Sequence, residues 1–226
     1  VQEAIEISQP DIVIHLAAES HVDRSINGPK IFLESNVLGT YNLLQICTNY
    51  FLNLSKEKKS LFRFHHVSTD EVFGSLGDKG SFDEKSNYSP NNPYSASKAS
   101  SDHFVNAWHN AYQLPVLISN CSNNYGPWQY PEKLIPLAIL NGFKNKPIPM
   151  YGNGLNIRDW LYVEDHIDAL LSVAMLGNIG ERYCIGGSSE LTNLEVLKLI
   201  CHQLDKIIPK SFSHFELIIP EKDRKG

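Results

Sequence analysis

The order of apolar and amphipathic stretches in the first half of the chain is the feature that most limits its fold. Short apolar segments suited to strands occupy 11–16, 61–68 and 115–120, and helical periodicity runs near 30–54 and 93–113. Strand, long helix, strand, long helix and strand in succession predict a parallel sheet with right-handed crossovers. Because the chain opens within what reads as the helix before a middle strand, we expect an α/β, Rossmann-like doubly wound sheet that is incomplete at its N-terminal end.

After about residue 130 the elements become shorter and turns more frequent. We expect helices near 131–142, 164–176 and 193–205, and short strands near 148–151, 158–162, 182–185 and 215–219. The sequence therefore predicts two domains, with the sheet in 1–130 and a smaller mixed α/β lobe in 131–226. The charged run Lys56-Glu57-Lys58-Lys59 is expected to be a solvated loop.

The tripeptide Thr69-Asp70-Glu71 comes directly after the second predicted strand. Ligands and chemistry gather at the carboxyl ends of parallel strands in open α/β sheets. Two adjacent carboxyl groups there can take different protonation states, one a general acid and the other a base. The simpler alternative is an Asp-Glu helix start or a solvated turn, which the position after a buried strand makes less favoured.

Tyr94 and Lys98 are four residues apart on a predicted helix, so their side chains share one face. A phenol has a pKa of about 10, and a neighbouring ammonium favours the phenolate, which could accept a proton from an alcohol near neutral pH. Alcohol oxidation by a nicotinamide enzyme needs such a base. The pair by itself is weak evidence, because an exposed helical pair in the serine-rich stretch 95–101 has the same spacing.

Composition excludes several other classes of protein. The net charge is −5 with no basic stripe, so nucleic acid is not an expected partner. The four cysteines form no C-x-x-C pair and the histidines lack zinc-site spacing, so we expect a reducing cytoplasm and no metal at the site. No apolar run of about 18 residues and no secretory leader is apparent, which argues against a membrane association.

Five segments taken together resemble the dTDP-glucose 4,6-dehydratases, which are extended short-chain dehydrogenase/reductase enzymes. They are 15–25, 68–74, 93–98, 119–127 and 157–166, and they span most of the chain. The Thr-Asp-Glu triplet is the specific part of the resemblance. The Tyr-x-x-x-Lys pair marks only the wider superfamily.

The resemblance implies a lyase of nucleotide-sugar metabolism and deoxysugar biosynthesis that holds NAD. Tyr94, assisted by Lys98 and Thr69, would oxidise the C4 hydroxyl of a nucleotide-linked glucose. Glu71 would then remove the C5 proton while Asp70 protonates the departing C6 hydroxyl, and hydride would return to C6. The implied product is a 4-keto-6-deoxy sugar.

The resemblance also implies a binding shell. The residues that match NAD contacts, besides Tyr94 and Lys98, are Leu16, Ala17, Ala18, Glu19, Ser20, Ser35 and Asn124. The residues that match sugar, pyrophosphate or base contacts, besides Ser20 and Thr69, are Asn123, Lys133, Leu134, Pro149, Met150, Tyr151, Arg158, Asn193, Asp223 and Arg224.

Arg158 is the strongest candidate in that shell, because a planar guanidinium suits a diphosphate. A structural pair of Arg158 with Asp159 or Asp165 is the alternative. Asn123 and Asn124 also have a plain turn interpretation.

The sequence departs from the family pattern at several positions. No G-x-x-G-x-x-G loop precedes the first strand, and Gly152-Asn153-Gly154 lacks the strand-loop-helix context that such a loop needs. Ser35, Phe73 and Cys184 stand where the family has Thr, Tyr and often Asn. We therefore expect a central piece of a longer dehydratase, which by itself binds NAD poorly and turns over little.

Two other functions and one assembly stay open. A UDP-sugar epimerase or decarboxylase would share Tyr94 and Lys98 but needs no acid-base pair, and a catalytically silent remnant would act only by pairing with other subunits. Family members commonly form homodimers through a bundle of two long helices from each subunit. The residues that could supply its apolar surface are Leu33, Val37, Tyr41, Leu44, Phe104 and Trp108, about half of which are expected to cover the sheet instead.

Overall fold

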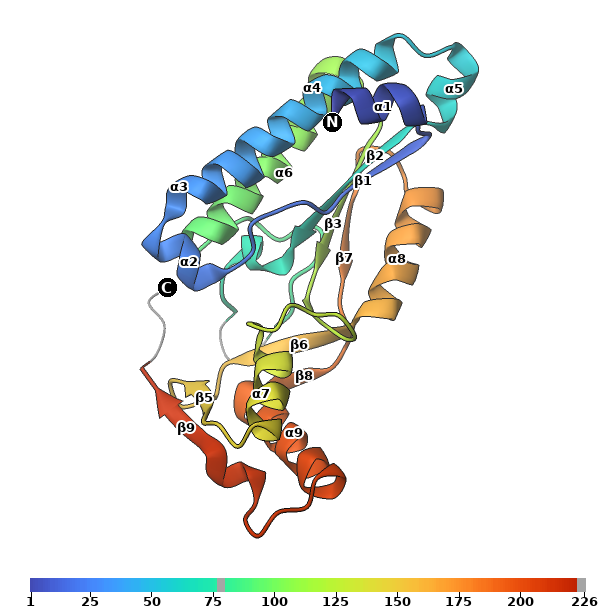
Figure 1. Cartoon of the computed structure of the whole chain (residues 1–226). Coiled ribbons are helices and arrows are strands. Elements are labelled where there is room, and N and C mark those ends of the chain that lie inside the picture. The colour runs from blue at the N-terminus through green and yellow to red at the C-terminus, as the bar shows by residue number, and fades with distance from the viewer. Residues whose placement is uncertain (77–79, 223–226) are drawn as a thin grey trace. The chain divides into compact units, whose positions relative to one another are not determined.

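A computed structural model describes residues 1–76 and 80–222 of the chain (Figure 1). These residues form two compact units. Among the described residues, the first unit comprises 1–76, 80–121 and 167–185, and the second comprises 122–166 and 186–222. The segment 167–185, expected in the second lobe, belongs to the first unit because its strand joins the sheet.

The first unit contains a four-stranded, all-parallel sheet. Its order is β1 (Ile12–His15), β2 (Arg63–Thr69), β3 (Val116–Cys121) and β7 (Arg182–Ile185). Helices α4 (Gly39–Leu52) and α6 (Pro93–Tyr112) lie on one side of this sheet, and α8 (Val163–Leu176) lies on the other (Figure 1). The Rossmann-like α/β class predicted from the order of elements is confirmed.

The expected helix near 30–54 is a composite. After α1 (Gln2–Ser8) and α2 (Val22–Asn27), it begins with α3 (Pro29–Phe32), continues as the π-helical η1 (Leu33–Leu38) and ends with α4. Its inner side packs with α6 on a core of Ile5, Leu44, Cys47, Phe62, Phe64, Val105, Trp108, Leu114, Val116 and Ile118.

The charged run at 56–59 is not a loop, contrary to the expectation. It lies in α5 (Lys56–Leu61), whose N-cap Ser55 accepts a hydrogen bond from Lys58 N at 3.3 Å. A side-chain cap of this kind satisfies an otherwise unpaired N–H and stabilises a short helix. Ser55 ahead of a run of Lys and Glu, which are good helix formers, is the local signal that the loop interpretation overlooked.

The second unit is built from short strands and two helices. Strand β4 (Asn123–Tyr125) pairs in parallel with β6 (Ile157–Tyr162), which pairs antiparallel with β8 (Glu190–Thr192). Strand β5 (Ile148–Tyr151) pairs in parallel with β9 (Ile218–Glu221). Helices α7 (Leu134–Phe143) and α9 (Asn193–Ile207), with η3 (His214–Leu217), pack on a core of Ala138, Ile148, Leu197 and Cys201.

Candidate active site

The triplet Thr69-Asp70-Glu71 lies at the carboxyl end of β2, where the strand passes into the 3-10 helix η2 (Asp70–Phe73). Thr69 is the N-cap of η2, and its Oγ1 accepts a hydrogen bond from Glu71 N at 3.2 Å. The helix-start alternative therefore describes the local backbone correctly. It does not exclude chemistry, because the same turn aligns the side chains of Thr69, Asp70 and Glu71 beside the sheet edge.

Gly74 ends this turn in a conformation that favours glycine. Its φ is +90°, and a Cβ at this position would come within 2.3 Å of Ser89 O. The following segment then returns to η2, with Ser89 N donating to Val72 O at 2.9 Å. A side chain at residue 74 would separate these backbones and displace the triplet.

Tyr94 in the first turn of α6 meets the triplet. The side chain of Thr69 hydrogen-bonds to the Tyr94 phenol, and the charges of Glu71 and Asp70 also act on it. Helix α6 begins next to this point because Asn92 and Ser95 form a capping box and Pro93 occupies the first turn. The four side chains that the sequence predicted to act together are therefore neighbours.

The electrostatics of Tyr94 differ from the sequence-based expectation. Burial and the negative charge of Glu71 raise the pKa of Tyr94 well above its ordinary value, and Tyr94 is only 8% exposed. The hydrogen bond from Thr69 is the contact that favours the phenolate. The spacing to Lys98 predicted the opposite direction, because it gave the neighbouring ammonium but neither the burial nor the carboxylates.

Lys98 is buried and is not part of an exposed helical pair. It is 4% exposed, and its Nζ donates to Val67 O at 2.9 Å. Burial is the main cause that lowers the pKa of Lys98. An ammonium has three donors, so Lys98 can hold the β2 backbone and still donate to a ligand.

The loop after β1 contains the residues expected to contact NAD. Leu16 is a large apolar side chain directly after β1, and it is 58% exposed. Glu19 is held from the side of η1, because Asn36 Oδ1 accepts from Glu19 N at 2.8 Å and Asn36 Nδ2 donates to Glu19 O at 3.0 Å. The same Nδ2 donates to Ser97 Oγ at 2.8 Å, so Asn36 joins this loop to α6.

The other expected binding residues belong mostly to the second unit. Asn123 and Asn124 lie on β4, Lys133 and Leu134 at the start of α7, Pro149, Met150 and Tyr151 on β5, Arg158 on β6, and Asn193 at the start of α9. Asp223 and Arg224 lie outside the described residues. Gly152 and Gly154 lie in the turn after β5, where both have positive φ, and no helix begins at this turn.

Arg158 is exposed, and its Nη1 donates to the neighbouring Ile157 O at 2.9 Å. Asp159 instead accepts from Gly187 N and Ser189 N, both at 2.7 Å. The alternative in which Asp159 is the structural partner of Arg158 is therefore not supported. This leaves the guanidinium accessible to a ligand.

Sequence reasoning missed a buried polar cluster next to the triplet. Asp102 on α6 is fully buried and accepts from Ser68, Tyr88 and Asn120. The helical spacing that linked Tyr94 to Lys98 continues to Asp102, four residues further on, and this signal could have found it. In residues 1–76 and 80–222, no group of three His, Cys, Asp or Glu is arranged to hold a metal ion.

A parallel α/β sheet with a buried Tyr-x-x-x-Lys pair on the following helix and an acidic triplet at a strand end defines an extended short-chain dehydrogenase/reductase. The family model described as GDP-mannose 4,6 dehydratase matches residues 1–224, and the chain belongs to this family.

Individual relatives agree with this assignment. A probable dTDP-glucose 4,6-dehydratase of Sinorhizobium fredii is 56% identical over the whole chain. The crystal structure of the dTDP-glucose 4,6-dehydratase of Streptomyces venezuelae, solved with NAD and a second ligand bound, is 42% identical over 99% of the chain, with a TM-score of 0.88. A UDP-glucose 4-epimerase of Thermus thermophilus in complex with NAD is 25% identical over the whole chain, with a TM-score of 0.85. The chain spans about 65% of the length of the first two relatives.

Proposed function

We propose that the protein is an NAD-dependent nucleotide-sugar dehydratase that converts dTDP-glucose to dTDP-4-keto-6-deoxyglucose. The observation on which the proposal rests is the meeting of Thr69, Asp70 and Glu71 with the Tyr94 phenol at one strand end. An alcohol base beside two carboxyl groups supplies what oxidation followed by elimination requires.

Each residue then has a role at a stated atom of the sugar. Tyr94 accepts the proton of the C4 hydroxyl, and the C4 ketone that forms makes the C5 proton acidic. Glu71 removes the C5 proton, and Asp70 gives a proton to the C6 hydroxyl, which leaves as water. NAD, when bound, would supply hydride acceptance from C4 and hydride return to C6, and Glu71 would give a proton back to C5 as C6 is reduced.

Thr69 connects the base to the acid. Its hydroxyl has one hydrogen, which can go to Asp70 Oδ1, 3.2 Å away, or to Tyr94. When Asp70 carries a proton, Asp70 can donate to Thr69 and Thr69 can donate to a Tyr94 phenolate. The form of the site with a protonated acid is thus the form that stabilises the base.

The residues around the site fit NAD. The exposed apolar surface of Leu16, Ala17 and Ala18 at the carboxyl end of β1 is where open α/β sheets bind dinucleotides. Glu19, Ser20, Ser35, Lys98 and Asn124 would complete the contacts. Calorimetry on the 226-residue chain should find weak NAD binding, and micromolar affinity would contradict this expectation.

We place the sugar, the pyrophosphate and the base on residues mostly of the second unit, with Arg158 on the diphosphate. The role of Arg158 is supported by its exposed guanidinium, since the carboxylate of Asp159 accepts hydrogen bonds from backbone N–H groups instead. Arg158→Lys keeps the charge but loses the planar fork. It should weaken binding of the nucleotide diphosphate, which competition calorimetry would measure.

The assay for the reaction is made in D₂O with dTDP-glucose on this protein. A dehydratase releases the C6 oxygen and incorporates solvent deuterium at C5. Glu71→Gln should abolish the deuterium incorporation, whereas the exposed Glu57→Gln should not alter it. Product formation without deuterium at C5 would refute the role of Glu71.

The main alternative is a UDP-sugar epimerase of the same superfamily, which the likeness to the Thermus thermophilus enzyme favours. An epimerase would keep the C6 oxygen and leave the C5 hydrogen unexchanged. A catalytically silent protein would give neither product, and Glu71→Gln and Tyr94→Phe would then leave cellular phenotypes intact.

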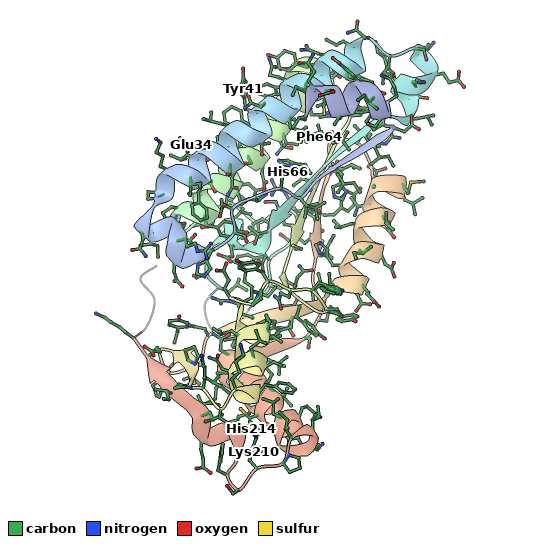
Figure 2. All side chains as sticks on the ribbon, viewed as in Figure 1. Glu34, Tyr41, Phe64, His66, Lys210 and His214 are labelled. Atoms are coloured by element: carbon green, nitrogen blue, oxygen red, sulfur yellow. The ribbon has the colours of Figure 1, made fainter. Side chains whose placement is uncertain are left out.

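We also propose a homodimer formed through the outer side of the composite helix and α6. Leu33, Tyr41 and Phe104 are exposed there, whereas Leu44 and Trp108 are buried in the core. Tyr41 and Glu34 lie on the outer side of the helical layer in Figure 2. Light scattering on Tyr41→Glu should report a monomer if this surface is the interface, and an unchanged mass would exclude it.

The proposal includes a cytoplasmic location and a nucleotide sugar as the partner, with neither nucleic acid nor membrane. The location is supported by the four cysteines at 47, 121, 184 and 201, none of which forms a disulfide. Within the described part of the chain, no helix has the length and apolar character needed to cross a bilayer. Cell fractionation with an antibody tests the location.

A further inference from the structure

The carboxylate of Asp102 is a shared acceptor inside the first unit. Tyr88 OH donates to its Oδ2 at 2.6 Å, Ser68 Oγ at 2.9 Å and Asn120 Nδ2 at 3.2 Å. His66 Nε2 lies 3.2 Å from the other oxygen, Oδ1. Asp102 is 0% exposed, so its charge is stabilised by these donors and not by water.

The residues that donate to Asp102 also fix the backbone next to Thr69, Asp70 and Glu71. Ser68 directly precedes Thr69, and Asn120 Nδ2 also donates to Thr69 O at 3.0 Å. Tyr88 belongs to the segment that returns to η2. Through these contacts, Asp102 on α6 fixes the end of β2 relative to the helix that carries Tyr94.

The second property of Asp102 is its charge next to Lys98. The two residues are four apart on one face of α6, and both are buried. A buried ammonium is costly without a nearby negative charge. The attraction of Asp102 opposes the lowering of the Lys98 pKa by burial.

Other groups face this pair from every neighbouring strand. His66 on β2 has a lowered pKa because of burial and Lys98, so its ring is neutral; its Nε2 is near Asp102 Oδ1, but the two atoms form no hydrogen bond. The ring of His15 on β1 lies 5.1 Å from that of His66. Cys121 on β3 acts on Lys98, and Arg182 on β7 lies over the Tyr88 ring at 4.4 Å. Figure 2 places His66 in the interior, beneath the helical layer.

We propose that Asp102 is a positioning residue of the active site: its ionised carboxylate is the buried counter-charge of Lys98 and the acceptor that fixes the Ser68-Thr69 backbone. The positioning part rests on the proposed function, because it assumes that Thr69 and Lys98 act in the reaction. The charge part is independent of any turnover. A merely structural cluster would stabilise the fold without controlling the protonation of Lys98.

The first test measures the protonation of Lys98 by NMR on ¹⁵N-lysine-labelled protein. Asp102→Asn should move the titration midpoint of the Lys98 ammonium downward by about one pH unit or more. Glu34→Gln is the matched control, since it removes a carboxylate of which 53% of the side chain is exposed, and it should leave the midpoint in place. An unchanged midpoint in folded Asp102→Asn would overturn the proposal.

A second measurement uses the unsubstituted protein, in case Asp102→Asn does not fold. The ¹³Cγ resonance of Asp102 should keep its carboxylate position between pH 8 and pH 5, about the range in which ordinary histidines titrate. The ¹⁵N resonances of His66 should report a neutral ring over the same range. A neutral Asp102 carboxyl would overturn the proposal. Neither result depends on dehydratase activity, so failure of the proposed function is a separate outcome.

Discussion

The buried histidines of the sheet should make the protein lose stability in mild acid. Burial, followed by the nearby His66 and Lys98, lowers the pKa of His15 from 6.5 to about 3. His15 is 7% exposed, and its Nε2 lies 3.0 Å from Thr40 Oγ1. Above about pH 6.5 the ring is neutral in both the folded and the unfolded chain, so it contributes no pH dependence.

Below that pH the unfolded chain takes up a proton that the folded chain does not. The free energy of unfolding should therefore fall by about 1.4 kcal/mol per pH unit for this group, or about 2.7 kcal/mol between pH 6.5 and 4.5. The loss continues until the pH reaches the lowered folded pKa of about 3. His66 acts in the same direction, because its folded pKa is also lowered.

Urea unfolding at a series of pH values between about 7 and 4.5 would measure this loss. This range lies above the ordinary pKa values of carboxyl groups, so histidines dominate it. His15→Gln should show a slope smaller by about 1.4 kcal/mol per pH unit, whatever its stability at neutral pH. His202→Gln is the control, because His202 is exposed and its replacement removes no buried imidazole. Parallel slopes for His15→Gln and the unsubstituted protein would refute the reasoning.

Three further changes test the packing and capping of the two units. Gly187→Ala should destabilise the second unit by about 1 to 3 kcal/mol in urea unfolding, because a Cβ there would come within 2.1 Å of a β6 carbonyl oxygen. Gly39→Ala should cost nothing, because a Cβ at residue 39 would be 3.8 Å from the nearest atom, Glu34 O. Hydrogen bonds from the His214 backbone and side chain hold the pKa of Asp205 at about 2, below its ordinary 3.8, so its contribution to stability is present above about pH 3.8 and is lost as the pH falls through 2. Asp205→Asn should therefore lower the thermal midpoint at neutral pH, and a difference that persists at pH 2 would contradict this account. Ser55→Ala should cost about 1 kcal/mol by removing the α5 cap, and equal hydrogen-exchange protection of α5 in both proteins would argue against it.

The periodicity of the sequence predicted the main elements of the sheet unit, because short apolar segments alternate there with long amphipathic helices, and both patterns can be recognised from neighbouring residues. It located β2 and α6 to within about two residues. The strands β4 and β8 were not predicted, since each has three residues and exists only through its pairing with β6. The π-helical stretch η1 also escaped prediction, because it reads as ordinary helix.

The sequence by itself determined which chemical groups the site has. The order Thr69-Asp70-Glu71 after a strand, and the helical interval from Tyr94 to Lys98, are local properties that any reader of the chain can count. Only the tertiary structure decided the electrostatic state of those groups. The burial of Tyr94 and Lys98, and the carboxylates that act on Tyr94, come from residues that are distant from them in sequence. Desolvation and charge interactions depend on distances in space, and spacing along the chain gives them only within one helix or strand.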